Sequence, residues 1–171
     1  IDILDSDVIS IVNLCNSKEV DLVVIGPEAP LAAGLADKLR SHNIVVFGPG
    51  ADGAKIESSK SWAKQLMHEG GIPTAKHWEA KSEEMALSIL YEVGHPLVIK
   101  ADGLASGKGV IVPKTMEETK QAIKRYFKGE FDSDSKKLLL EEIIEGPEIS
   151  IFGICDGEDL IILPPAQDHK R

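Results

Sequence analysis

Lys100-Ala101-Asp102-Gly103-Leu104-Ala105-Ser106-Gly107-Lys108-Gly109-Val110 is the segment that indicates most strongly how this chain folds. Its glycines allow the backbone to approach a ligand closely and to turn N–H groups towards it. Its lysines add positive charge, which suits a polyphosphate. Apolar residues precede it at 97–99 and follow it at 110–112, which predicts two flanking strands. The segment therefore predicts a flap that joins two strands and lies over phosphate groups.

The segment does not fit the Walker A loop, which binds phosphate between a strand and a helix. Only three residues separate Gly103 from Gly107 where that loop has four, and Gly109 stands where Ser or Thr should follow the lysine. A glycine-rich hairpin with incidental lysines is the alternative interpretation. Lys100 favours phosphate binding, because it ends the apolar run at 97–99 where another apolar residue or a turn former would be expected.

A second segment, Leu138-Leu139-Leu140-Glu141-Glu142-Ile143-Ile144-Glu145-Gly146-Pro147-Glu148, predicts a strand that runs out of its sheet. A strand that leaves its sheet exposes unpaired N–H and C=O groups, which can pair with the edge of an adenine base. A carboxylate a few residues later can accept hydrogen bonds from both hydroxyls of a ribose. The alternative is a solvated acidic segment. Two of its acidic residues adjoin Leu and Ile, which argues against a purely solvated role for at least one of them.

Lys60 follows Ser58-Ser59 at the start of a helix predicted over about 59–69. A lysine at such a position is by default a surface residue. It becomes a candidate phosphate ligand only beside the two segments above. The apolar residues of this helix pair at the spacing of one turn: Trp62 with Leu66, and Ala63 with Met67.

The first third of the chain alternates strand and helix patterns. The wholly apolar runs at 22–25 and 44–47 predict parallel strands buried on both faces. Between them we expect one helix with Pro30 in its first turn, and a helix over 6–16 precedes them. This is the pattern of the edge of a doubly wound sheet, which binds ligands at the carboxyl ends of its strands. The residues that follow the first strand are Gly26, Pro27 and Glu28. The helix between the strands places three leucines along one side: Leu31, Leu35 and Leu39.

A change of pattern near Pro73 indicates a domain boundary. Beyond it we expect helices at 83–93 and from Thr115 to Phe127, where Thr115 and Glu118 have the spacing of a capping box. A turn is expected at Asp156-Gly157. The expected strands of this region are 97–100, 110–112, 138–144, 149–154 and 160–163.

The composition argues against a nucleic-acid-binding protein and against a membrane protein. The chain has 171 residues, is 43% hydrophobic and carries a formal net charge of -9, which argues against a nucleic-acid surface. Cys15 and Cys155 are far apart, without metal-ligand spacing, which fits a reducing compartment. No apolar run approaches the ~20 residues that span a bilayer, and no signal peptide is visible. We therefore expect a cytoplasmic protein with no membrane partner. Both ends look cut, so we expect a fragment of a longer chain.

Lys60, the glycine-rich flap and the strand exit, in this order, resemble the ATP-grasp superfamily. That resemblance implies that Lys60 and Lys100 bind the nucleotide phosphates. It implies that Glu148 holds the ribose. It also implies a phosphate flap formed by Ser106, Gly107, Lys108 and Gly109, and an adenine-reading linker formed by Glu141, Glu142, Ile143 and Ile144, with the backbone of Glu142 and Ile144 on the base.

Five segments, the glycine-rich one among them, narrow the resemblance to the glycinamide ribonucleotide synthetase (phosphoribosylamine–glycine ligase) family, and the residues at 165–171 are closer to eukaryotic forms. The segments are Gly26-Pro27-Glu28-Ala29-Pro30-Leu31, Phe47-Gly48-Pro49, Gly71-Ile72-Pro73-Thr74-Ala75, residues 100–112, and Pro165-Ala166-Gln167-Asp168-His169-Lys170-Arg171. Ser106 departs from a usual alanine, and Pro147 stands where an acidic residue is common. The resemblance implies the end of a Rossmann-like parallel-sheet domain at 1–52, a connecting helix at 53–73, the ATP-grasp lid at 74–142, and the start of the second ATP-grasp subdomain at 143–171. The fold class is thus α/β and α+β.

The resemblance implies a ligase that phosphorylates glycine with ATP and passes the acyl group to the amine of 5-phosphoribosylamine, in purine biosynthesis. Gly26, Pro27 and Glu28 would hold phosphoribosylamine. Lys170 and Arg171 would contact a substrate phosphate or the acyl phosphate. The ligands of Mg²⁺ are expected beyond residue 171, so this chain would have no metal site and would not catalyse the full reaction alone. Another ATP-grasp ligase and a non-catalytic nucleotide-binding module are the alternatives, and fusion to later purine-pathway enzymes is left open.

Overall fold

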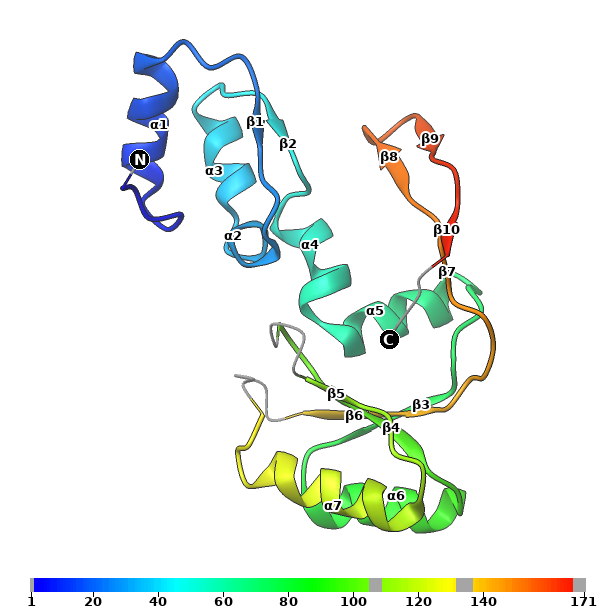
Figure 1. Cartoon of the computed structure of the whole chain (residues 1–171). Helices are drawn as coiled ribbons and strands as arrows, with labels where there is room; N and C mark the ends of the chain where they lie inside the picture. The colour runs from blue at the N-terminus through cyan, green and yellow to red at the C-terminus, as the bar shows by residue number, and fades with distance from the viewer. Residues whose placement is uncertain (1, 105–108, 132–136, 168–171) are drawn as a thin grey trace.

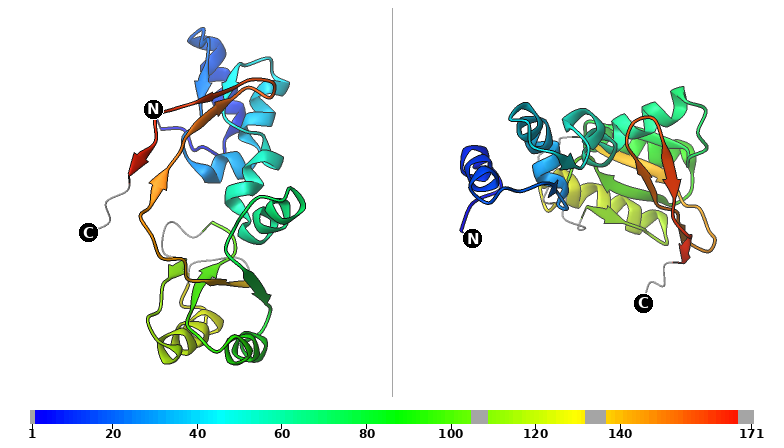
Figure 2. Two further views of the ribbon diagram at one scale, coloured as in Figure 1. Left: turned by 90° about the vertical axis from the view of Figure 1, so that its right-hand side faces the viewer. Right: turned by 90° about the horizontal axis from the view of Figure 1, so that it is seen from above.

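The computed structural model describes residues 2–104, 109–131 and 137–167. The elements form an N-terminal α/β unit, two connecting helices, and a four-stranded sheet that carries two helices (Figure 1). Short strands follow the sheet and run back along the connecting helices (Figure 2). Among the residues described, no helix has both the length and the apolar character needed to cross a membrane.

The N-terminal unit contains a parallel pair of strands, as the sequence predicts. Val23 pairs with Val46 and Val24 with Phe47. The prediction that these strands are buried on both faces is wrong: Val24 is 63% exposed and Phe47 50% exposed. In the described chain α1 and α3 lie on the same side of the pair, so side chains that point the other way stay open (Figure 1). The elements of this unit are α1 (Val8–Ser17), β1 (Val23–Val24), α2 (Glu28–Ala32), α3 (Leu35–Ser41) and β2 (Val46–Phe47).

The single helix predicted between the two strands is broken into α2 and α3. Gly34 lies at the break with a φ of 80°, which glycine adopts far more readily than other residues. The predicted apolar side survives the break, because α3 resumes with its side chains turned towards the same core. All three of its leucines are buried: Leu31, Leu35 and Leu39.

The connector consists of two helices, α4 (Ala51–Ser58) and α5 (Lys60–Glu69). The sequence predicts α5 but not a separate α4, because α4 is short and has few apolar residues. Ser59 is extended between them, and its hydroxyl accepts a hydrogen bond from Trp62 N at 3.3 Å, which caps α5. The predicted pair of Trp62 and Leu66 does not form the buried side of α5, since Leu66 is 41% exposed, whereas Ala63 of the second pair is buried and Met67 is partly buried. The buried residues are Ser61, Ala63 and Lys64.

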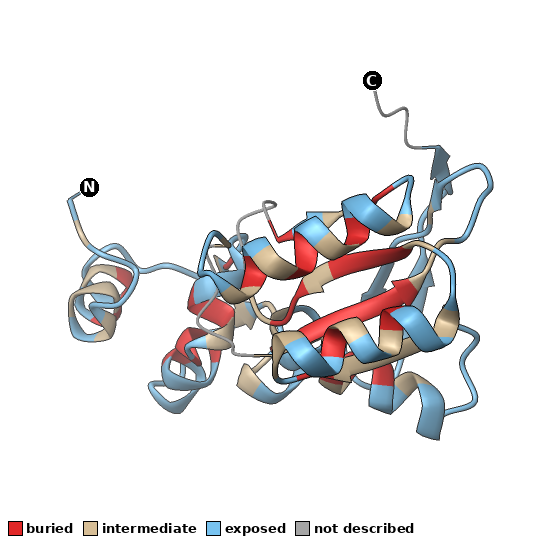
Figure 3. Ribbon diagram, turned by 90° about the horizontal axis from the view of Figure 1, so that it is seen from below, coloured by how far each residue is buried: buried red, intermediate tan, exposed pale blue. Residues whose placement is uncertain are grey.

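The four-stranded sheet is antiparallel in the order β3-β6-β4-β5. Both helices cover one face, where the buried residues of sheet and helices meet (Figure 3). The predicted helix at 83–93 is confirmed as α6, and the predicted cap of α7 is confirmed, because Thr115 Oγ1 accepts from Glu118 N at 3.1 Å. Strand β3 was not predicted. The elements are β3 (His77–Ala80), α6 (Glu83–Val93), β4 (Leu97–Ala101), β5 (Val110–Ile111), α7 (Met116–Phe127) and β6 (Leu138–Glu142).

The last described segment is a run of short, exposed strands. The predicted turn at Asp156-Gly157 is confirmed between β8 and β9, which pair as an antiparallel hairpin. Asp156 Oδ1 accepts from Asp159 N at 2.8 Å and from Glu158 N at 3.0 Å, and these backbone hydrogen bonds hold the pKa of Asp156 below its usual value. The strand predicted at 149–154 is split in two. The elements are β7 (Ile149–Ser150), β8 (Gly153–Cys155), β9 (Leu160–Ile162) and β10 (Ala166–Gln167).

Candidate nucleotide-phosphate site

Lys100 lies within β4 on the face of the sheet opposite to α6 and α7. Side chains alternate along a strand, so Ile99 and Ala101 face the helices while Lys100 faces away. In the neighbouring strand β6, Glu141 shares the face of Lys100. Lys100 therefore stands on a rigid, doubly paired strand rather than on the loop that follows it.

Glu141 lies between two lysines in a nearly closed environment. Its Oε2 lies 2.9 Å from Lys100 Nζ and 3.3 Å from Lys64 Nζ, and the residue is only 5% exposed. Lys64 Nζ also donates to Thr74 Oγ1 at 2.6 Å and to Ala75 O at 3.4 Å. The carboxylate of Glu141 is thus the shared counter-ion of both ammonium groups.

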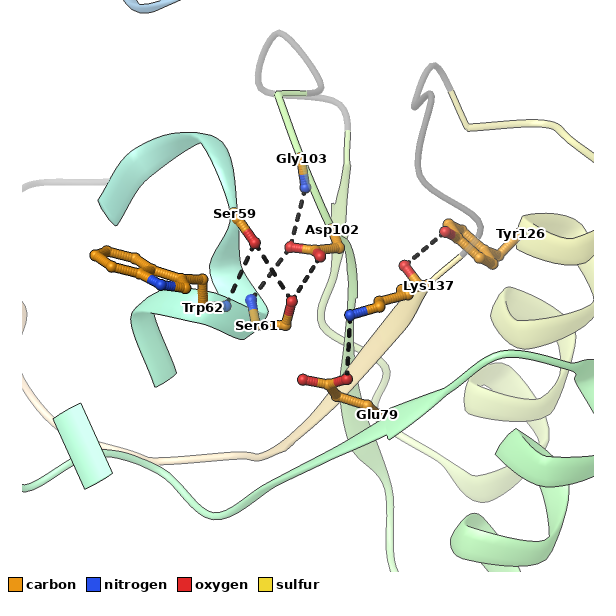
Figure 4. A network of polar contacts seen from close by, with 8 residues as sticks. All are labelled: Ser59, Ser61, Trp62, Glu79, Asp102, Gly103, Tyr126 and Lys137. Carbon is orange, nitrogen blue, oxygen red and sulfur yellow. Dashed lines mark hydrogen bonds and ion pairs between the residues drawn. The ribbon is translucent and has the colours of Figure 1, made fainter. Parts of the chain in front are cut away.

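Lys60 meets the start of the glycine-rich segment from the other side. It is the first residue of α5, and its Nζ donates to Gly103 O at 2.7 Å. A second contact joins the same two segments, because Asp102 accepts from Ser61 N at 3.2 Å and from Ser61 Oγ at 2.7 Å (Figure 4). A carboxylate is favoured at the first turn of a helix, where backbone N–H groups point outward. Asp102 therefore holds the entrance of the glycine-rich segment on the first turn of α5.

Tyr126 contacts the residue that precedes β6. Its hydroxyl donates to Lys137 O at 2.7 Å, just before β6 begins (Figure 4). Burial raises the pKa of Tyr126 above its usual value, and the negative charge of Asp102 adds to this shift. Lys137 in turn lies 3.6 Å from Glu79 Oε2, across the sheet. The loop ends around Asp102 and Lys137 are thus tied to neighbouring elements.

A hollow of about 260 Å³ brings together three of the residues that the sequence singled out. These are Lys60, Lys100 and Glu141. The segments that carry them lie far apart in the chain, so their convergence is a property of the fold. The remaining lining residues are Ile56, Glu57, Ala63, Lys64, Met67 and Thr74.

A second hollow, of about 330 Å³, lies beside α4. Gly26 and Glu28 line it, as does the C-terminal part of α4. Ile56 and Glu57 line both hollows, so the end of α4 forms a common wall between them. The other residues of the second hollow are Leu31, Pro49, Gly53 and Ala54.

The predicted adenine linker follows β6. Glu142 N donates to Lys76 O at 3.0 Å, so this N–H is already used within the fold. Ile143 is partly buried, whereas Ile144 is 73% exposed and Glu148 is exposed. The structure therefore does not bring Glu148 into either hollow.

Several predicted residues fall outside these contacts. Gly109 is buried, and its carbonyl accepts from Ala101 N at 2.7 Å. Pro27 precedes α2 as its N-terminal cap and is exposed. Within the described ranges, no group of three or more His, Cys, Asp or Glu side chains could hold a metal ion. Five predicted residues lie outside the described residues: Ser106, Gly107, Lys108, Lys170 and Arg171.

Among the lining residues that the sequence did not single out, Lys64 and Thr74 contribute polar contacts to this site. Lys64 carried a usable signal, because it lies four residues after Lys60 and therefore on the same side of a helix. Thr74 carried none, since only the fold brings its hydroxyl to Lys64. Asp102 was noted as part of the glycine-rich segment, but its role as the partner of α5 was not foreseen.

Comparison with known proteins shows the family of this chain. Residues 58–171 match the family described as phosphoribosylglycinamide synthetase, ATP-grasp (A) domain, and residues 1–57 match its N domain. A phosphoribosylamine–glycine ligase of Synechocystis is 46% identical over 94% of this chain, which spans 38% of that protein. The human trifunctional purine biosynthetic protein adenosine-3 is 44% identical over 97% of this chain, which spans 17% of it. These identities do not separate eukaryotic from bacterial forms.

A crystal structure of phosphoribosylamine–glycine ligase from Thermotoga maritima supports the same assignment. It superposes with a TM-score of 0.65 at 36% identity, over 70% of this chain and 31% of that one. The resemblance predicted from the sequence is therefore confirmed at the level of the family. This chain belongs to the phosphoribosylglycinamide synthetase family, with residues of its N domain followed by residues of its ATP-grasp domain.

Proposed function

We propose that this chain supplies the phosphate-binding side of an ATP-dependent ligase that joins glycine to 5-phosphoribosylamine. The observation that carries the proposal is the convergence of Lys60 and Lys100 on one hollow, where Lys60 contacts Gly103 of the glycine-rich segment and Lys100 contacts Glu141. Two cations on rigid elements beside a glycine-rich segment suit a polyphosphate. Membership of the phosphoribosylglycinamide synthetase family supplies the reaction.

The proposed reaction proceeds in two transfers. A carboxylate oxygen of glycine attacks the γ-phosphorus of ATP, the bond to ADP breaks, and glycyl phosphate forms. The amine of phosphoribosylamine then attacks the acyl carbon, phosphate leaves, and the amine loses a proton to give the amide. Lys60 and Lys100 would stabilise the negative charge that moves across the phosphoryl oxygens during the first transfer. Lys60 would exchange its bond to Gly103 O for a phosphate oxygen.

The second hollow is our proposed site for phosphoribosylamine. Gly26 and Glu28 line it, and Pro27 lies between them in the chain. Its wall, Ile56 and Glu57, is shared with the hollow of the lysines, so an amine placed here would lie next to the acyl phosphate. Proximity of this kind is a large part of what a ligase contributes to its reaction.

The adenine and ribose of ATP would lie along the segment that follows β6. Because Glu142 N is used by Lys76, the linker would offer an adenine the carbonyl of Glu142 and the N–H of Ile144, with Ile143 between them. Glu141 would act through Lys100, and Glu148 would reach the ribose. Ser106, Gly107, Lys108 and Gly109 would cover the phosphates, and Lys170 and Arg171 would contact a substrate phosphate. The described residues offer Mg²⁺ no cluster of ligands, so no step above is routed through it.

We further propose that the enzyme acts in the cytoplasm. The boundaries of its parts would be 1–52, 53–73, 74–142 and 143–171. The family match instead divides the chain after residue 57, within the predicted connector. The trifunctional human relative makes fusion to other purine-pathway enzymes a reasonable arrangement for this one as well.

Binding and turnover test the proposal separately. This chain should bind ATP weakly, and Lys100→Ala should weaken binding by about tenfold to hundredfold, since one charge-assisted contact contributes about 1.5–3 kcal/mol. Lys38→Met, on the exposed side of α3, is the control. Unchanged affinity in Lys100→Ala would remove Lys100 from the phosphate site.

The turnover assay uses a protein that spans the full length of the relatives. Given glycine, phosphoribosylamine and Mg·ATP, it should release ADP and form glycinamide ribonucleotide. ADP formed only with a different carboxylate or amine would point to another ATP-grasp ligase. ATP binding without any ADP would point to a non-catalytic nucleotide-binding module.

A further inference from the structure

Lys64 is the one charged residue of α5 that is buried, and the ligase mechanism above leaves it without a role. Its side chain is 10% exposed. Three acceptors surround its ammonium group: Glu141 Oε2, Thr74 Oγ1 and Ala75 O. Its two hydrogen bonds, to Thr74 and Ala75, and its ion pair with Glu141 therefore hold the ammonium group in place. Burying a lysine is unfavourable unless it is paired, so the pairing with Glu141 accounts for its burial.

The charges around Glu141 do not cancel. Glu141 contributes one negative charge, while Lys64 and Lys100 contribute one positive charge each, so the three residues together carry one positive charge. The side chains of Lys64 and Glu141 are 10% and 7% exposed, whereas that of Lys100 is 28% exposed. The member of the group most open to the hollow is thus the lysine proposed to bind phosphate.

Without Lys64, the charge of Lys100 would be largely cancelled by Glu141 at 2.9 Å. A neutral pair acts on a distant anion only as a dipole, and its attraction falls off faster than that of a net charge. With Lys64 in place, Glu141 is already neutralised from its other side. Lys100 can then keep one hydrogen bond to Glu141, which orients it, and still present a net positive charge.

We propose that Lys64 is a positioning residue, which neutralises Glu141 so that Lys100 offers uncompensated positive charge to the phosphates of ATP. This inference rests on the proposed function. It also gives a role to the segment after α5, since Thr74 and Ala75 hold the ammonium of Lys64 in place. A chain of contacts thus connects Thr74 to Lys100: Thr74 contacts Lys64, and Glu141 contacts both Lys64 and Lys100.

The test compares ATP with adenosine in the full-length protein, by titration calorimetry. Lys64→Met keeps the length of the side chain and removes its charge. Affinity for ATP should fall by about tenfold, the effect of about 1.4 kcal/mol, while affinity for adenosine stays within about twofold. Lys38→Met, an exposed lysine of α3, should change neither affinity. A lysine with a merely structural role would weaken both ligands alike when it is replaced.

A second substitution tests the charge argument itself. Adding Glu141→Gln to Lys64→Met leaves Lys100 as the sole charge of the group, so affinity for ATP should return to within about threefold of the original. If Lys64→Met does not fold, Thr74→Val removes one of the three acceptors of Lys64 and should weaken ATP alone by about twofold to threefold.

The outcomes separate this inference from the proposed function. Failure of the original protein to bind ATP would overturn both. Binding that depends on Lys100 but is unchanged in Lys64→Met, or a double variant as weak as Lys64→Met, would overturn the role of Lys64 alone. An equal loss of ATP and adenosine would also overturn it.

Discussion

The two faces of the four-stranded sheet use the same strands for different purposes. On the face towards α6 and α7, Ile99 and Leu140 are fully buried in an apolar cluster. On the opposite face, the adjacent residues Lys100 and Glu141 form an ion pair beside a hollow. Because successive side chains of a strand point to opposite faces, one segment can supply a core and a binding site together. Each site residue is then held by the packing of its neighbours in the chain.

Two single substitutions of adjacent leucines, one on each face of the sheet, should show the largest difference between the faces. Leu140→Ala opens a cavity in the apolar cluster and should lower the free energy of unfolding by about 2–5 kcal/mol, with ATP affinity of the folded protein unchanged. Leu139→Ala lies on the other face, paired with Lys100. It should cost about 2 kcal/mol and also weaken ATP by roughly threefold. Urea unfolding and ATP titration measure the two effects. Equal ATP affinity in both variants would contradict the division between faces.

Substitution of Asp102 measures how much its contact with α5 contributes to the stability of the protein. Asp102→Ala removes the partner of Ser61 N and of Ser61 Oγ, and should lower the free energy of unfolding by about 1–2 kcal/mol. Asp52→Ala is the matched control: Asp52 lies in the first turn of α4, as Asp102 lies against the first turn of α5, but Asp52 is exposed, so little change is expected. Similar effects of the two substitutions in urea unfolding would show that the burial of Asp102 is irrelevant.

The smallest expected effect is a change in the pH dependence of stability, and it comes from Tyr126 on the helix-covered face of the sheet. Its pKa is raised by burial and then by Asp102, so the folded protein resists its ionisation while the unfolded chain does not. The resulting stability is present below the unfolded pKa of about 10 and is lost as the pH rises through the folded pKa. Unfolding free energies measured between about pH 9 and 11 should therefore fall more steeply in the original protein than in Tyr126→Phe. Parallel slopes would contradict this.

Local patterns in the sequence predicted the elements that depend on local interactions. The helix at 83–93, the Thr115 cap and the turn at Asp156-Gly157 all rest on contacts within a few residues. The two strands around the glycine-rich segment were also predicted, because each is an apolar run. The family could be predicted because the sequence contains its motifs with few departures, such as Ser106 and Pro147.

The missing parts depend on contacts between distant segments. Strand β3 has only four residues, and its pairing with β6 defines it. Helix α4 has little apolar periodicity, so its role as the wall of two hollows was invisible. Lys64 resembles a surface lysine in the sequence, and only the approach of Thr74 and Glu141 makes it a buried one. The contacts that join the candidate site residues could therefore not be predicted from the sequence.

The order of the strands also bears on how this protein is made. Strand β6 lies between β3 and β4, yet it is the last of the sheet to leave the ribosome. Until residues 138–142 emerge, β3 has no neighbour and one edge of β4 stays open, a state in which nascent chains are prone to misassociate. The same strand brings Glu141 to Lys64 and Lys100. During synthesis, completion of the sheet and assembly of the charged site are therefore a single event.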